Sequence, residues 1–386
     1  MHDWMEIKNQ IDQYVVRLSE LHAIRKKCIE ESVQILHGEL SANWSIWKEA
    51  AQQEIRRLAP DFDEAPDAVY PVAGNPPPAV LISSDGSQIF PNRHEIAPLA
   101  LITTSRIRID YDRYRETPLM DSRARIFLQE DFNDRLGAKR EIAFEDLISD
   151  ERALEEMETL AHLAHEPFSK NRDTPIIALS DGSLILWRLA ERYERDYEAA
   201  IIEKYIAVLE RFEQSQIPLA GYISSSNSRE VVNLIRLVKE SQRSDWLFSE
   251  QENDPVVTDS EIFSRVLRKG QRSTLFHSQS KIILEKYGDQ RISYFYLHVG
   301  DEIAKVEIPR WIASDPKRVD GVAAYCLQQS QIGGGYPIVL SEAHEHAVVR
   351  GPDRETFYRL VEEALRRRGA DPRYSSKHLR KRVPLT

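Results

Sequence analysis

Hydrophobic and polar residues follow two different periods along the chain, and the changes of period divide it into expected helices and strands. Short apolar runs typical of buried strands occupy residues 79–82, 99–110, 175–179 and 219–223. Apolar residues with helical spacing occupy residues 4 to about 58, 151–165, about 190–214, 229–240 and about 353–368. Residues 291–299 and 302–308 alternate on either side of Gly300-Asp301, which predicts a β-hairpin. Strands that alternate with helices predict a mixed α/β sheet flanked by helices.

Changes in composition along the chain predict four segments. They are an N-terminal helical arm at residues 1–58, a linker rich in proline and acidic residues at 59–78, a core at 79–350, and a C-terminal helix with a basic tail at 351–386. The core is expected to contain a helical and polar insertion at about 188–270. Within it, the polar residues 241–270 are expected to lie on the surface.

Apolar residues of the expected arm recur at alternating steps of three and four, as on one narrow stripe of a helix. The stripe consists of Ile11, Tyr14, Leu18, Leu21, Cys28 and Ile35. Arg25 and Ser32 interrupt it, which favours an arm that packs on the rest of the protein over a long coiled coil. The stripe fits two alternatives, which are packing against the core and contact with a partner or a second copy.

Two segments share one design, in which an aspartate directly follows an expected buried strand. They are residues 80–87, VLISSDGS, and residues 177–183, IALSDGS. Glycine then lets the chain turn immediately. Carboxylates at the ends of neighbouring strands can bind one divalent cation, and such hard oxygen ligands suit Mg²⁺ or Mn²⁺. Asp85 and Asp181 are therefore candidate metal ligands, with a simple Asp-Gly turn as the alternative for each.

A third acidic ligand is expected from the helix at 151–165. At about 100° per residue, Glu156 falls inside the apolar half of this helix, Glu158 lies just past its opposite border, and Glu155 points outward. A carboxylate on a core-facing stripe is costly unless a cation compensates it. Glu156 is the first candidate for this ligand and Glu158 the second, with a solvated border position as the alternative.

Histidine and tyrosine follow the glycine-rich residues 333–335. His344 comes after an apolar run, where it is placed to ligate a metal or move a proton, and Tyr336 lies eight residues upstream. A structural histidine is the alternative. His162 and His165 share one face of the expected helix, but no zinc motif surrounds them, so a structural role is expected.

The composition excludes several classes of protein. The chain has 386 residues, 41% of them hydrophobic, which is enough for a sizeable core. Two cysteines, Cys28 and Cys326, cannot form a disulfide framework or a cysteine-rich zinc site, which favours a reducing cytoplasm. Neither a signal peptide nor a run that could span a membrane is present, so a cytoplasmic protein without membrane contact is expected.

Common catalytic motifs are absent as well. The sequence has no phosphate-binding Gly-x4-Gly-Lys-Ser/Thr loop, no dinucleotide-binding glycine motif, no His-Glu-x-x-His zinc helix and no Gly-x-Ser-x-Gly elbow. The chain is therefore not expected to hydrolyse ATP itself. The acid-rich, cysteine-poor candidates suit hydrolysis assisted by Mg²⁺ or Mn²⁺.

The charge of the chain changes what is expected of a polyanionic partner. Acidic residues number 62 against 52 basic ones, for a net charge of −10. The basic residues gather towards the C-terminus, at Arg366, Arg367, Arg368, Lys377, Arg380, Lys381 and Arg382. Lys281 and Arg310 lie near the expected strands and are candidate phosphate contacts. The charge thus predicts weak binding of nucleic acid by the free protein rather than none.

Several blocks of the sequence resemble the NurA family of nucleases, and they occur in the order of that family. They are Asp85-Gly86-Ser87, Asp181-Gly182-Ser183-Leu184, Leu219-Ala220-Gly221-Tyr222-Ile223-Ser224, Ser278-Gln279-Ser280-Lys281, and Tyr336-Pro337 followed by Ala343-His344 and Ala347. The resemblance implies an RNase H-like core, a homodimer and cleavage of DNA with Mn²⁺ or Mg²⁺. It also implies work on DNA ends beside a HerA-type hexameric ATPase.

The resemblance assigns roles to residues of this chain. Asp85 matches the first metal aspartate of the family and Asp181 the later one, while the helix glutamate is either Glu156 or Glu158. The tyrosine and histidine of the last motif complete the implied catalytic set of Asp85, Glu156, Asp181, Tyr336 and His344, in which His344 is also a candidate metal ligand. After the fourth expected strand, family members have Ser-Arg-Pro where this chain has Ser224-Ser225-Ser226-Asn227. This difference removes a cation near the expected substrate groove.

Three functions are compatible with these residues. The first is a metal-dependent DNA nuclease, a 5'-3' exonuclease or an endonuclease, that acts in repair or defence with a hexameric HerA-like ATPase. The second is a non-catalytic DNA-end or ATPase adaptor with the same fold. The third is a metal-dependent hydrolase of RNA or small phosphoesters. The complete acidic set favours the first.

Overall fold

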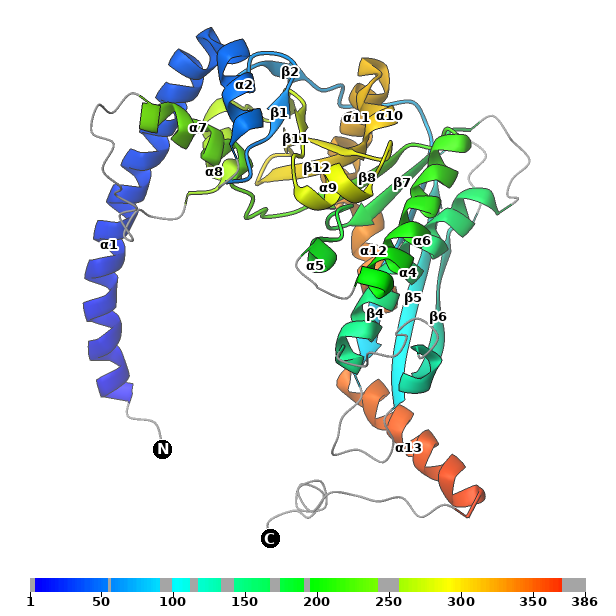
Figure 1. Cartoon of the computed structure of the whole chain (residues 1–386). Helices are drawn as coiled ribbons and strands as arrows, with labels where there is room; N and C mark the ends of the chain where they lie inside the picture. Colours follow the sequence, from blue (N-terminus) through cyan, green and yellow to red (C-terminus); the bar gives the residue numbers. More distant parts are fainter. Residues whose placement is uncertain are drawn as a thin grey trace. The chain divides into compact units, whose positions relative to one another are not determined.

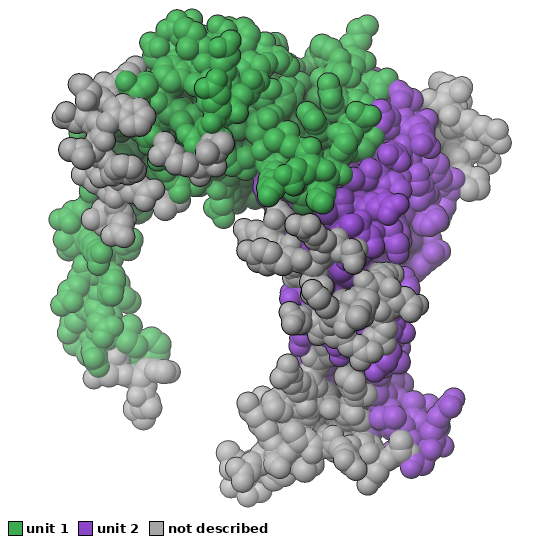
Figure 2. Space-filling model, viewed as in Figure 1, with its two compact units in different colours: residues 1–74, 222–327 green, residues 75–221, 328–386 purple. Residues whose placement is uncertain are grey.

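The computed structural model describes residues 4–54, 57–90, 99–111, 117–132, 142–166, 174–190, 195–241 and 257–369 (Figure 1). The chain forms two compact units, coloured separately in Figure 2. Unit 1 consists of Met1–Gly74 and Tyr222–Leu327, and unit 2 consists of Asn75–Gly221 and Gln328–Thr386. Each unit is therefore built from two separate stretches of chain. The division into arm, linker, core and tail stays a prediction.

Unit 1 combines helices with a small antiparallel sheet. Its helices are α1 (Trp4–Ile35), the π-helix η1 (Leu36–Leu40), α2 (Trp44–Gln53), α7 (Glu230–Ser241), α8 (Asp259–Val266), α9 (Lys281–Lys286), α10 (Arg310–Ala313) and the first part of α11 (Pro316–Ile332). Its strands are β1 (Asp61–Phe62), β2 (Val69–Pro71), β9 (Gln271–Ser273), β10 (Phe276–His277), β11 (Ile292–His298) and β12 (Ile303–Pro309). The strands β11 and β12 pair antiparallel, which confirms the predicted hairpin.

The burial of the arm helix changes along its length. The stripe residues Ile11, Tyr14, Leu18 and Leu21 are exposed in this single chain, while Ile29 and Leu36 are buried in the core of unit 1. The predicted continuous helix is interrupted at Gly38, whose φ of −93° and ψ of −108° are not helical. The later stripe residues Cys28 and Ile35 pack against this core, whereas contact of the earlier, exposed residues with a partner or a second copy stays a prediction.

Of residues 241–270 the structure describes 241 and 257–270, and the prediction that they lie on the surface is wrong for the inner face of α8. In α8 the side chains of Ile262 and Phe263 are fully buried, and the ring of Phe263 stacks on Tyr296 at a centroid distance of 4.5 Å. Because α8 contains many polar residues, its apolar face is not apparent from the sequence. Residues 242–256 lie outside the described part of the chain.

A charged group is buried in unit 1. Lys305 Nζ lies 2.8 Å from Glu230 Oε1, 3.5 Å from Glu307 Oε1 and 3.9 Å from the ring centroid of Tyr294. Asp259 is also buried, and it accepts hydrogen bonds from the backbone N–H groups of Val231 and Val232 and from the hydroxyl of Tyr296. These contacts join α7, α8 and the hairpin in one polar cluster inside an apolar core.

Unit 2 is a mixed sheet flanked by helices, as predicted. Its strands are β3 (Val80–Ser84), β4 (Gly86–Ile89), β5 (Leu99–Asp110), β6 (Leu119–Leu128), β7 (Ile176–Asp181) and most of β8 (Leu219–Ile223). Its helical elements are the 3₁₀ turn η2 (Gln129–Phe132), α4 (Phe144–His165), α5 (Trp187–Ala190), α6 (Arg195–Gln214), α12 (Ile338–Ala347) and α13 (Gly351–Arg367). The helices α4 and α12 pack on the sheet, and α6 packs on α4.

In unit 2, β3 lies between one antiparallel and one parallel neighbour. It pairs antiparallel with β5 and parallel with β7, and β5 also pairs with β4 and β6. All five residues of β3 are buried, as a central strand requires. The strand β6 was not predicted, because residues 122–126 are exposed and give it no alternating apolar pattern. No described helix has the length and apolar character needed to cross a lipid bilayer.

Candidate functional site

The two aspartates of the repeated motif lie at the same edge of the sheet. The strands β3 and β7 run parallel in a register that pairs Ser84 with Ser180, so Asp85 and Asp181 are the next residue on each strand. Adjacent strands are about 4.8 Å apart. The structure therefore brings the two predicted carboxylates together, as the sequence pattern indicates.

The backbone at Asp85 is fixed by the neighbouring strand β5. The Asp85 N–H donates to Ser105 Oγ at 3.0 Å, and the Ser105 N–H donates to the Asp85 carbonyl at 2.8 Å. The Gly86 N–H donates to Asp85 Oδ1 at 2.8 Å. These bonds hold one carboxylate oxygen against the backbone and leave Oδ2 for another partner.

That partner is His344, which comes from α12. Its Nδ1 lies 3.0 Å from Asp85 Oδ2. The His344 side chain is 59% exposed, whereas that of Asp85 is 16% exposed. The imidazole therefore covers the carboxylate from the solvent side.

Glu156 reaches the same place from α4. The predicted turn after Asp85 is wrong, because β4 continues along β5 in the register of β3, with Gly86 opposite Thr104 as Ser83 is opposite Ile107. A Cβ added to Gly86 would lie 2.5 Å from Glu156 Oε1, so only glycine lets this strand approach the carboxylate so closely. Burial raises the pKa of Glu156 to about 8; Arg152 lowers it, and the charges of Asp85 and Asp181 raise it further. The structure thus places Glu156 with both aspartates.

Tyr336 is tied to the second aspartate. Its hydroxyl donates a hydrogen bond to the Asp181 carboxylate. Asp181 is exposed on one side, but partial burial on the others raises its pKa, Tyr336 and His344 lower it, and Asp85 raises it. A Cβ on Gly333 would collide with the Tyr336 carbonyl, so this glycine permits the tight turn that delivers the tyrosine.

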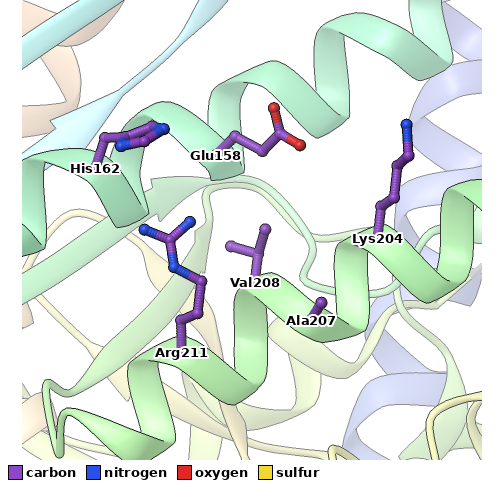
Figure 3. A pocket seen from close by; sticks show the side chains of 6 residues that line it. All are labelled: Glu158, His162, Lys204, Ala207, Val208 and Arg211. Atoms are coloured by element: carbon purple, nitrogen blue, oxygen red, sulfur yellow. The ribbon is translucent and has the colours of Figure 1, made fainter.

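Glu158, the second candidate for the helix ligand, faces a different part of unit 2. With His162 it lines a hollow of about 310 Å³ whose other wall is formed by α6 (Figure 3). The residues on that wall are Lys204, Ala207, Val208 and Arg211. The structure therefore groups Glu156, rather than Glu158, with Asp85 and Asp181.

The prediction that Glu155 points outward is wrong. This side chain is buried and its carboxylate accepts a hydrogen bond from Arg125 of β6. Burial raises its pKa to about 7, against the lowering effect of Arg125. Since β6 has no apolar alternation, nothing in the sequence indicates that a second element covers this side of α4.

The predicted phosphate contacts lie in unit 1. Lys281 begins α9 and is exposed, with Nζ 3.9 Å from Glu285 Oε1, and Arg310 begins α10. Their roles stay predictions. In the basic tail, Lys377, Arg380, Lys381 and Arg382 lie outside the described residues.

Arg152 is a residue of the site that the sequence analysis did not single out. It precedes Glu156 by one helical turn, and its Nη1 donates to the Gly86 carbonyl at 2.8 Å. Its spacing of four from Glu156 is visible in the sequence, but such pairs are common on exposed helices. Ser105 gave no signal, because it lies within a strand.

The acidic side chains provide the oxygen ligands of a cation site, but they do not point at one common position. No three acidic, histidine or cysteine side chains among the described residues are already placed to hold a metal ion. Within that same part of the chain, however, Glu156 Oε1 is buried and accepts no hydrogen bond, and its ion-pair contact with Arg152 Nη1 is 3.4 Å long. Like charges that crowd together and an unsatisfied buried oxygen are what a divalent cation would relieve. The donor set therefore fits such a cation once the side chains turn to a common point.

Taken together, the fold and the site define a mixed α/β protein with an acidic group at the ends of two parallel strands. The sequence model of the NurA domain matches residues 80–349. The chain therefore belongs to the NurA family, which gives it a nuclease-family role.

Comparison with other known proteins adds two distant likenesses in structure. A crystal structure of NurA bound to dAMP and manganese is 13% identical, with a TM-score of 0.36 over 89% of this chain and 97% of that chain. An Argonaute from Kluyveromyces polysporus with a guide RNA is 8% identical, with a TM-score of 0.27 over 69% of this chain and 25% of that one. No curated protein matches the sequence.

Proposed function

We propose that this protein is a metal-dependent deoxyribonuclease that processes DNA ends in the cytoplasm, as a 5'-3' exonuclease, an endonuclease or both. The observation that carries the proposal is the grouping of Asp85, Glu156 and Asp181 with Tyr336 and His344 in unit 2. Membership of the NurA family supports it. The proposed cofactor is Mn²⁺ or Mg²⁺, because the donors are hard oxygens.

The order of strands supports an RNase H-like core. In unit 2 the first long strand, β3, is central, with an antiparallel neighbour β5 on one side and a parallel neighbour β7 on the other. The helix α4 lies in the chain between β6 and β7. Such a core presents carboxylates from the ends of parallel strands and from the helix that covers them.

In this proposal Asp85, Asp181 and Glu156 hold the cation, and His344 lies beside them as a further candidate ligand. A bound divalent cation supplies activation of water and neutralisation of the charge that grows on the scissile phosphate. His344, held by Asp85, takes or returns a proton at the edge of the site. Tyr336, held by Asp181, orients the phosphate or a base.

The direct test is cleavage of end-labelled linear DNA with and without Mn²⁺, for the wild type and Asp181→Asn. We expect cleavage only with metal and its loss in the variant, while the melting temperature of the variant stays near that of the wild type. Metal-independent cleavage, or equal cleavage by the variant, would refute the proposal. A parallel panel with RNA and small phosphoesters tests the hydrolase alternative.

One observation favours a second candidate, a non-catalytic DNA-end or ATPase adaptor. The described residues contain no completed set of metal ligands. A calorimetric titration with Mn²⁺ separates the two functions, because an adaptor with unused carboxylates binds no cation. Absence of heat together with retained DNA binding would favour the adaptor.

We further propose two kinds of protein partner. The lack of a phosphate-binding loop supports a separate hexameric HerA-like ATPase as the motor, and gel filtration of the two co-expressed proteins tests the complex. The exposed stripe at Ile11, Tyr14, Leu18 and Leu21 supports a homodimer. Light scattering of the wild type and Leu18→Lys tests the dimer, since a charge on the stripe should shift it towards monomer.

A further inference from the structure

We propose that Arg152 is a positioning residue that clamps Glu156 of α4 to the strand backbone at Gly86, directly after Asp85. The inference rests on the proposed function, because it concerns how two of the proposed metal ligands are held at a fixed separation. Neither the family match nor the sequence motifs assign a role to this arginine.

One guanidinium nitrogen makes both contacts of the clamp. Arg152 Nη1 donates to the Gly86 carbonyl at 2.8 Å and lies 3.4 Å from Glu156 Oε1. Gly86 follows Asp85 directly in the chain. The arginine thus connects the peptide next to the first aspartate with the carboxylate of the helix.

The packing around this contact is tight. A Cβ on Gly86 would lie 2.8 Å from Arg152 Cγ and 2.5 Å from Glu156 Oε1, so the strand at Gly86 packs directly against both side chains. If Arg152 were shortened, the space it fills would open beside Glu156. The glutamate would then reach other rotamers, and its oxygen would no longer be held at one place beside the aspartates.

An ordinary ion pair on one helix does not account for these observations. Two exposed residues four apart on a helix stabilise only that helix. Here the guanidinium also bonds a carbonyl of a different element, and the side chain is 32% exposed. Moreover, Arg152 Nε is buried and has no hydrogen-bond partner in the described parts of the chain. A buried donor left unsatisfied is costly, and the clamp gives a reason for retaining it.

The choice of arginine follows from the two contacts. A guanidinium is planar and offers several N–H donors, whereas the ammonium of lysine is a compact point charge on a flexible stem. The two N–H groups of Nη1 are fixed in the guanidinium plane, whereas the ammonium of lysine at position 152 rotates on its stem and holds the carbonyl and the carboxylate less firmly. Outer partners that orient ligands in this way typically change metal affinity by about 10- to 100-fold when they are removed.

The test compares Mn²⁺ binding of the wild type, Arg152→Gln and Arg152→Lys by calorimetry, together with melting temperature and DNA cleavage. Arg123→Gln is the matched control, because Arg123 is exposed on β6 and its loss changes the net charge equally. We expect Arg152→Gln to bind Mn²⁺ about 10- to 100-fold more weakly. We expect Arg152→Lys to lie between it and the wild type, and Arg123→Gln to match the wild type.

Each result decides the inference. A lower melting temperature of Arg152→Gln with Mn²⁺ affinity within about twofold of the wild type would show a structural role only and overturn it. If Arg152→Gln does not fold, Arg152→Lys decides alone, since wild-type affinity in that variant overturns the clamp and weaker binding supports it. If the wild type neither binds Mn²⁺ nor cleaves DNA, the proposed function itself has failed, and the clamp falls with it.

Discussion

The imidazole of His344 lies against the carboxylate of Asp85, with Nδ1 3.0 Å from Oδ2, although the two residues are 259 positions apart in the chain. An ionised carboxylate only accepts hydrogen bonds, so this contact places the proton of the ring on Nδ1. The lone pair of a neutral ring is then on Nε2. Asp85 thereby selects the tautomer in which His344 presents an acceptor on its other nitrogen.

Replacing His344 should impair cleavage without loss of the fold. His344→Gln removes the acceptor that Asp85 orients, and loss of a proton-transfer group typically slows a reaction by about 10²- to 10⁴-fold. The rate on end-labelled DNA at saturating Mn²⁺ measures this. His346→Gln is the control, because His346 Nδ1 instead contacts the backbone carbonyl of Glu342 on the same helix. Equal rates for both variants would remove His344 from the mechanism.

A metal titration should distinguish Glu156 from Glu158 of α4. Glu156→Gln should weaken Mn²⁺ binding by at least about tenfold, because an uncharged amide replaces a proposed ligand next to Asp85 and Asp181. Glu158→Gln should leave the affinity unchanged, because Glu158 lines the hollow against α6. Calorimetry on both variants decides between them. The reverse order of affinities would make Glu158 the helix ligand.

Adding one methyl group after the first aspartate should disturb the site. In Gly86→Ala the new Cβ meets Glu156 Oε1 at 2.5 Å, so the strand or the helix has to shift, at a cost of about 1–3 kcal/mol. We expect a lower urea midpoint and weaker Mn²⁺ binding together. Gly321→Ala is the control, since no atom lies within 4 Å of its added Cβ. A Gly86→Ala protein with wild-type Mn²⁺ affinity would contradict the close packing.

The buried lysine of unit 1 should be important for stability. Lys305→Gln leaves Glu230 and Glu307 buried without their cation, and breaking a buried ion pair in this way costs about 3–5 kcal/mol. Urea unfolding followed by circular dichroism measures the loss. Lys286→Gln, at an exposed position of α9, should change the free energy of unfolding by less than about 0.5 kcal/mol. Similar values for both variants would contradict the burial of this cluster.

Unit 1 should also lose stability as the pH rises through the range in which Asp259 ionises. Burial raises the pKa of Asp259 to about 6, Tyr296 and the backbone N–H groups lower it, and the charge of Glu230 on α7 raises it. The unfolded value is about 3.9, so the folded state binds the proton more tightly. Its contribution is full below pH of about 4 and is lost as the pH approaches 6, by about 2–3 kcal/mol.

Comparison with Asp259→Asn isolates this group from the other titrating residues, including Lys305 in the same cluster. Urea midpoints are measured between pH 4 and 7 for both proteins. The stability of the wild type relative to the variant should fall across this range. A constant difference would show that Asp259 keeps its ordinary pKa.

The part of the site that lies on regular elements could be predicted from the sequence. An aspartate that ends a buried strand twice, with the same flanking residues, is visible as a pattern, and parallel pairing of β3 and β7 then brings Asp85 and Asp181 together. The helical projection likewise placed Glu156 inside the apolar half of α4. In both cases the regular geometry of the strand or helix determines in which direction a side chain points.

The remainder depends on contacts between distant segments. The helical projection predicts that Glu155 points outward, and because β6 has no apolar alternation, nothing in the sequence indicates that Arg125 covers this side chain. The role of Arg152 is visible only from its contact with the Gly86 carbonyl, which is 66 positions away in the chain. Buried polar pairs of this kind leave no period in the sequence, because each partner looks like an ordinary surface residue by itself.

The interruption of unit 2 by residues 222–327 has a consequence for how the protein is made. A ribosome completes β3, α4 and β7, and then a large part of unit 1, before it reaches Tyr336 and His344. A nascent or truncated chain therefore contains the three carboxylates but neither of the residues that hold the aspartates from α12 and the turn before it. For a protein that we propose cuts DNA, this order of translation would make synthesis as far as α12 a condition for activity.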